Sequence, residues 1–155
     1  MSFLLTLDNS SSDYSRIIEI IPRYEKLVQE AEPIFQIEGK RLEEVMRNLP
    51  YHQSRFDQAL QDMKGLEEWL NTVRDRLTAK YWKKYTEHYS RALSTKDIQS
   101  YIAGEKEILE LNQVTIEVAL IKNNLGAIVE SLKQMGWMLG HVTKLRVAEL
   151  QDAIL

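Results

Sequence analysis

Residues 35–77 read FQIEGKRLEEVMRNLPYHQSRFDQALQDMKGLEEWLNTVRDRL, and apolar side chains recur in this stretch every seven residues. With Phe35 taken as position a of a heptad, only Glu38 and His52 interrupt the apolar a and d positions. This period predicts a long helix with a coiled-coil-like seam. Pro50 falls at position b, where it can bend the helix without filling the seam. The apolar a positions are Phe35, Leu42, Leu49, Phe56, Met63, Leu70 and Leu77, and the apolar d positions are Val45, Ala59, Leu66 and Val73.

The rest of the chain is also poor in residues that break helices. Its 155 residues include six Gly, three Pro and no Cys. A β-sandwich or a doubly wound sheet needs many more turn residues, so we predict one all-α domain of long helices. The absence of Cys excludes disulfides and fits a reducing compartment. No apolar run is long enough to span a membrane, so we expect no membrane partner.

The N-terminal half of the domain is predicted to span residues 13–91, after a mobile tail at residues 1–12. A first helix begins near Asp13, and Pro22 either restarts or kinks it. Glu32 and Pro33 end that helix, and the heptad helix follows from Phe35. Beyond Leu77 the seam positions become Lys, so we expect residues 78–91 to project from the packing partner.

The C-terminal half, residues 92–155, is predicted to hold three helical segments. Ser94 and Asp97 have the spacing of a capping box for a short helix, which ends near Gly104. A second long helix runs from about Glu105 until Gly136 breaks it. A last helical segment then covers residues 137–152.

A broad apolar stripe on the second long helix predicts self-association. Its members include Leu111 and Val118, and a slim helical chain has few other elements to cover such a stripe. The alternative is a compact antiparallel bundle that buries both stripes internally. The residues that we assign to a contact between copies are Leu125, Ile128, Leu132, Trp137, Val142 and Leu145.

Positive charge is concentrated in one short part of an acidic chain. The whole chain has a net charge of −3, but residues 71–91 contain six basic and two acidic side chains. Within them, residues 80–91 read KYWKKYTEHYSR and form the stretch that we call the basic–aromatic segment. Single-stranded nucleic acid is bound by this combination, because cations neutralise phosphates and rings stack on unpaired bases. The candidate DNA-binding residues in the segment are Lys80, Tyr81, Trp82, Lys83, Lys84, Tyr85 and Arg91.

The same segment has a simpler interpretation, which the residues alone favour. It also fits a solvated amphipathic helix whose Tyr rings pack and whose Lys ammonium groups reach water. No catalytic or metal site competes with either interpretation: His88 and His141 lack a second ligand at helical spacing, and His52 lies in the seam. No phosphate loop or nucleophile motif occurs, so we expect a non-enzymatic protein without a cofactor.

Three stretches in a fixed order resemble the UvsY family of phage recombination mediators. Residues 77–85, LTAKYWKKY, are similar to the basic–aromatic DNA-binding motif of that family, and residues 101–107, YIAGEKE, to its short acidic connector. Residues 136–146, GWMLGHVTKLR, are similar to its C-terminal pattern of Gly, aromatic and aliphatic residues with a terminal Arg. This last motif adds Leu139 and Arg146 to the candidate self-association residues. The resemblance covers residues 35–152.

The resemblance implies a non-catalytic mediator that binds single-stranded DNA in the cytoplasm of a phage-infected bacterium. It implies contact with a RecA-like recombinase, displacement of single-strand-binding protein, and a ring-like homo-oligomer in the hexamer to heptamer class, joined through the C-terminal part. The DNA-binding role carries over to Lys80, and by proximity to Lys83 and Lys84. Thr78 stands where the family motif can carry a basic residue, which implies weaker DNA affinity or a role moved to Lys83 and to Arg74 and Arg76.

A structural protein without a nucleic-acid role is the alternative function. The heptads and the acidic pI of about 5.7 suit a coiled-coil scaffold or assembly chaperone equally well. Retention on single-stranded DNA at low salt separates the two functions.

Overall fold

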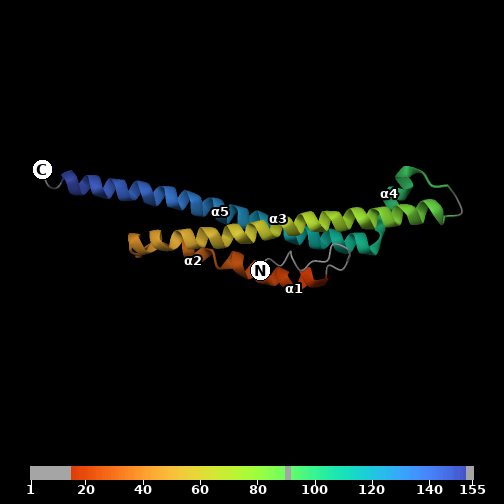
Figure 1. Ribbon diagram of the computed structural model, residues 1–155, viewed down its shortest axis with the longest axis horizontal. Coiled ribbons are helices and arrows are strands. Elements are labelled where there is room, and N and C mark those ends of the chain that lie inside the picture. Colours follow the sequence, from red (N-terminus) through yellow and green to blue (C-terminus); the bar gives the residue numbers. More distant parts are fainter. Residues whose placement is uncertain (1–14, 90–91, 153–155) are drawn as a thin grey trace.

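The computed structural model describes residues 15–89 and 92–152, and every regular element in these ranges is a helix. The predicted all-α class is therefore confirmed. The predicted mobile tail at residues 1–12 and Arg91 lie outside the described residues. In chain order the helices are α1 (Ser15–Gln29), α2 (Glu32–Phe35), α3 (Leu42–Glu87), α4 (Thr95–Gly104) and α5 (Lys106–Asp152) (Figure 1).

Helices α3 and α5 lie side by side and run in opposite directions (Figure 1). The direction follows from their contacts, because the partners of later α3 residues come earlier in α5. The Gln53 side chain donates to the Leu132 carbonyl at 3.3 Å, and the Lys122 ammonium binds the Glu67 carboxylate at 2.7 Å. Helix α1 packs along the same pair, and α4 closes the end where α3 finishes and α5 begins (Figure 1).

The predicted heptad residues form the core of this pair. In α3 the a-position residues Phe56, Met63 and Leu70 are at most 1% exposed. Facing residues of α5 are equally buried, and complete burial of a Leu side chain stabilises a fold by about 1.5–3 kcal/mol. The fully buried α5 residues are Leu111, Val118, Leu125 and Leu132.

This packing corrects the expectation that the α5 stripe lacks a partner within the chain. The α3 seam and the α5 stripe cover each other, as in the antiparallel alternative, because the segment from residue 88 to residue 105 turns the chain back on itself. Leu125 and Leu132 are therefore occupied inside the subunit. Any contact between copies must use other residues.

Two predicted helix boundaries were wrong. Helix α3 begins at Leu42 and not at Phe35, because Gly39 adopts φ of +75° and interrupts the chain between α2 and α3. Helix α5 continues through Gly136 and forms one 47-residue helix. At that position α3 comes so close that a Cβ atom would lie 3.0 Å from Leu49 Cδ2, so Gly136 permits close packing and does not end the helix.

The shorter helices follow the predicted signals only in part. Pro22 lies inside a continuous α1, so the predicted restart at this residue is wrong. Glu32 and Pro33 do not end α1, which ends at Gln29, but begin α2, where the missing N–H of Pro33 costs nothing. The capping box of α4 is confirmed: the Ser94 hydroxyl accepts the Asp97 backbone N–H, and the Asp97 carboxylate accepts the Ser94 backbone N–H. Within the described ranges, no helix combines the length and apolar character that crossing a membrane requires.

Candidate nucleic-acid interface

Residues 80–87 of the basic–aromatic segment form the last turns of α3, near the first turn of α5. Lys80 binds the Glu107 carboxylate at 3.4 Å, and Lys84 binds Glu105 at 3.0 Å. The predicted projection of residues 78–91 is therefore only partly right. The Lys residues that replace apolar groups in the seam meet Glu107 in the first turn of α5 and Glu105 just before it, and the last turns of α3 extend past the start of α5 (Figure 1).

The ammonium groups of this segment still reach solvent. The side chains of Lys80, Lys83 and Lys84 are 63%, 70% and 55% exposed. Lys83 has a carboxylate neighbour on its own helix, because its Nζ atom lies 3.9 Å from Glu87. Ion pairs this exposed contribute only about 0–1 kcal/mol each, so a polyanion can compete for the three ammonium groups.

Two Tyr residues anchor the segment to α5 by different means. Tyr85 donates a hydrogen bond of 2.6 Å to Glu105, and this bond is the largest cause that raises the pKa of Tyr85 to about 12. The same bond and the Lys84 contact lower the pKa of Glu105. Burial raises the pKa of Tyr81 to about 12, because its ring is only 6% exposed. Tyr81 is thus placed as a core residue, and its ring is not accessible for stacking on a base.

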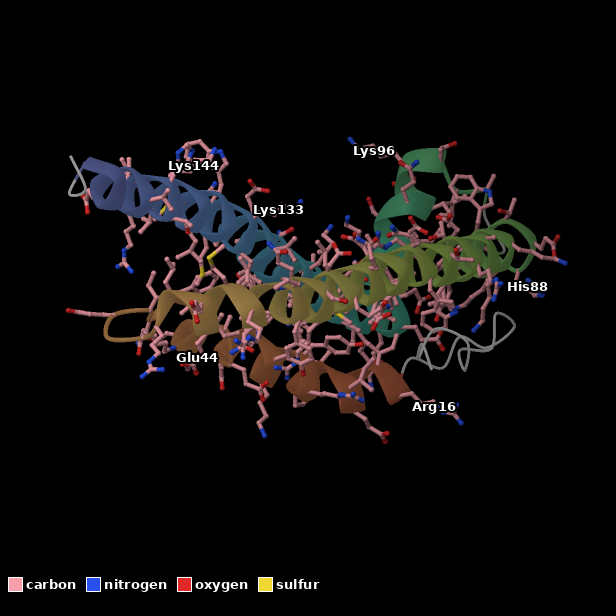
Figure 2. The ribbon with its side chains drawn as sticks, turned by 60° about the vertical axis from the view of Figure 1, so that its left-hand side comes forward. Arg16, Glu44, His88, Lys96, Lys133 and Lys144 are labelled. Carbon is pink, nitrogen blue, oxygen red and sulfur yellow. The ribbon has the colours of Figure 1, made fainter. Side chains whose placement is uncertain are left out.

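An aromatic cluster lies beside these cations, at the end of the molecule that Figure 2 marks with His88. It joins Tyr85 and Tyr89 of the α3 end to Tyr101 of α4. The ring centroid of Tyr101 lies 5.6 Å from that of Tyr85 and 6.3 Å from that of Tyr89. Tyr89 and Tyr101 are 50% and 46% exposed, and their rings are nearly parallel, at 24°. Both rings therefore present surface on which a base could stack.

The remaining predicted DNA-binding residues are less closely grouped. Trp82 is partly buried and lines a shallow groove on α3 together with Thr78 and Lys83. Arg76 is exposed one turn before Lys80. Arg74 is partly buried, and one guanidinium nitrogen donates to the Asn71 side chain at 3.2 Å.

The predicted self-association residues separate into two sets. Leu125, Leu132 and Leu139 are buried within the subunit, and Ile128 is partly buried against the same core. The others are exposed on the C-terminal third of α5, which reaches past the start of α3 (Figure 1). These exposed residues are Trp137, Val142, Leu145 and Arg146.

Three residues of the site escaped the sequence analysis, namely Glu105, Glu107 and Tyr101. Each comes from the α4–α5 side, and their contribution depends on the reversal of the chain after α3. The sequence did contain a signal for the two carboxylates, because Lys at seam positions implies carboxylates on the facing helix.

Comparison of the chain with protein-family models, with curated proteins and with solved structures found no match. In the part of the chain that the structure describes, no group of His, Asp and Glu is arranged to hold a metal ion.

Proposed function

We propose that this protein binds single-stranded DNA as a non-catalytic recombination mediator. In this role it would help a RecA-like recombinase to load in place of single-strand-binding protein. The observation that supports the proposal is the grouping of Lys80, Lys83 and Lys84 with the exposed rings of Tyr89 and Tyr101 at one end of the molecule. Ammonium groups and rings at the same place suit phosphates and unpaired bases of one strand.

The carboxylates around the Lys residues favour weak binding. Glu105 and Glu107 neutralise part of the positive potential, and the chain as a whole carries net negative charge. Binding should therefore weaken steeply as salt rises, because the free energy comes mainly from displaced counterions. Weak sites suit a protein that must release the strand to a recombinase.

Self-association is the second part of the proposal. Several copies of a weak site on one assembly bind a long strand much more tightly than one copy, because later contacts are intramolecular. The exposed apolar side chains of α5 support such an assembly. They include Trp137, which is 70% exposed, and Leu145, which is 64% exposed.

A triple substitution tests the DNA site. Replacing Lys80, Lys83 and Lys84 by Ala should abolish most binding of a fluorescent single-stranded oligonucleotide, measured by anisotropy at low salt. The matched control replaces Lys64, Lys133 and Lys144, which are exposed elsewhere (the last two are labelled in Figure 2) and remove the same charge. An equal loss of oligonucleotide binding in both variants, or retained binding in the first variant, would contradict the assignment of the DNA site to these three Lys residues.

A structural scaffold remains the second candidate function. The observation in its favour is that each Lys of the segment already has a carboxylate neighbour within the chain. Absence of retention on single-stranded DNA at every salt concentration would favour this function over the mediator.

A further inference from the structure

The face of α5 that points away from α3 carries a second apolar line. An α-helix turns by about 100° per residue, so residues seven, eleven and eighteen positions apart lie on nearly the same line. Leu109, Ile116, Leu120, Met138 and Leu145 share this line, and each is between 55% and 64% exposed. We call this line, with the exposed residues Ala127 and Gln134 that complete it, the outer face of α5.

The outer face contains no charged residue, and Gln134 is the one polar residue among its seven members. Its members are spaced by seven, four, seven, seven, four and seven residues, with Ala127 at the centre. The 36 residue steps from Leu109 to Leu145 complete ten helical turns and extend about 54 Å. A straight helix therefore keeps the whole line on one side.

A two-fold axis at Ala127 would set a second copy of this line end to end against the first. In that arrangement Leu109 meets Leu145 of the other copy and Ile116 meets Met138. Leu120 meets Gln134. Ala127 meets its own equivalent on the two-fold axis. Because Ala127 is small and its neighbour Gly126 has no side chain, two helix backbones can approach closely at the centre.

Charges beside the outer face favour the same orientation. On one flank, Lys106 and Glu110 lie near the start of α5, and Arg146 and Glu149 lie near its end. An antiparallel pair brings Lys106 opposite Glu149 and Glu110 opposite Arg146, so that opposite charges meet. A parallel pair would place this flank opposite the other flank of its partner, so these four charges would not meet one another.

We infer that the outer face of α5 binds a second copy of this chain, antiparallel, about a two-fold axis at Ala127. The inference specifies the contact for the self-association in the proposed function, and it does not depend on DNA binding. A two-fold contact of this kind uses the same surface on both copies. It leaves the basic–aromatic segments at opposite ends of the pair.

Single Cys substitutions test this pairing, because the chain has no Cys of its own. Ala127→Cys should form a covalent dimer on oxidation, since a disulfide needs Cα atoms about 4.4–6.8 Å apart. Leu109→Cys alone and Leu145→Cys alone should stay uncrosslinked, because each lies far from its own equivalent. Reassociated together, these two variants should crosslink to each other.

The possible results separate the pairing from the self-association itself. Crosslinking of Leu109→Cys alone would indicate a parallel pair and overturn the inference. A parent chain that associates in sedimentation, with no crosslink in any variant, would overturn the pairing but leave self-association intact. A monomeric parent chain at all concentrations would overturn both, while oligonucleotide anisotropy still tests DNA binding. Ile116→Glu should lower the association constant at least tenfold with unchanged helix content, because the side chain is exposed within one subunit.

Discussion

The Tyr85 hydroxyl and the Lys84 ammonium bind the same oxygen of Glu105, at 2.6 Å and 3.0 Å. In the proposed DNA complex this carboxylate would compete with a phosphate for Lys84. Glu107, in the first turn of α5, would compete in the same way for Lys80.

Removing this competitor should strengthen DNA binding. In the double variant Glu105→Gln and Glu107→Gln, two negative charges leave the site while the side-chain shapes remain. Exposed pairs contribute about 0–1 kcal/mol each, so we expect affinity for a single-stranded oligonucleotide to rise roughly fivefold at low salt. The control is Glu43→Gln with Glu44→Gln, at the opposite end of α3. Equal gains in both variants would indicate a general effect of net charge and no local competition.

Tyr101 should contribute to DNA binding by stacking its ring on a base, and not by charge. Substitution by Ala should weaken binding of an oligonucleotide with bases by about 1–3 kcal/mol, and leave binding of an abasic strand unchanged. Tyr51, which is 65% exposed on the first turns of α3, provides the control substitution. If Tyr101→Ala weakens both strands equally, the ring does not stack on bases.

Alkaline pH should destabilise the packing of α1. Burial, with the neighbouring Asp62, raises the pKa of Tyr24 from 10.0 to about 12. Because the folded state favours the protonated phenol, its contribution is complete below pH 10 and is lost as pH rises toward 12. Urea unfolding followed by circular dichroism should show a loss of stability in this window. Tyr24→Phe should make the loss smaller, and an unchanged pH profile would contradict the assignment.

Two glycines of α5 should respond differently to the same substitution. Gly140→Ala meets no atom within 4 Å, so it should raise the free energy of unfolding by about 1 kcal/mol through helix propensity. Gly136→Ala brings a methyl group to 3.0 Å from Leu49 Cδ2, so it should gain less or lose stability. Thermal unfolding of the two variants measures the difference. An equal gain would mean that Leu49 moves aside without cost.

Sequence periodicity was sufficient to predict what α3 buries, but not which element buries it. The residues at Phe56, Met63 and Leu70 were identified from their spacing, because that spacing places them on one side of a helix. Their partner depended on whether the chain reverses after residue 88, and no local pattern settles that. The same reversal explains why Glu105 was missed as a neighbour of Lys84.

Gly136 shows the related difficulty with single residues. Gly lowers helix propensity locally, which favours a break, whereas close approach of a second helix favours Gly within a continuous helix. Whether the helix breaks or continues at Gly136 therefore depends on Leu49, which lies 87 positions earlier in the chain.

The length of the α3–α5 pair separates the two ends of the molecule. Lys84 faces the start of α5, while Leu145 lies near its end, so about 60 Å of helix stands between the cations and the apolar tip. Electrostatic influence fades over about 8 Å at physiological salt. Within one subunit, substitutions near Lys84 and near Leu145 should therefore have additive effects on the free energy of unfolding, because the two sites share no contact.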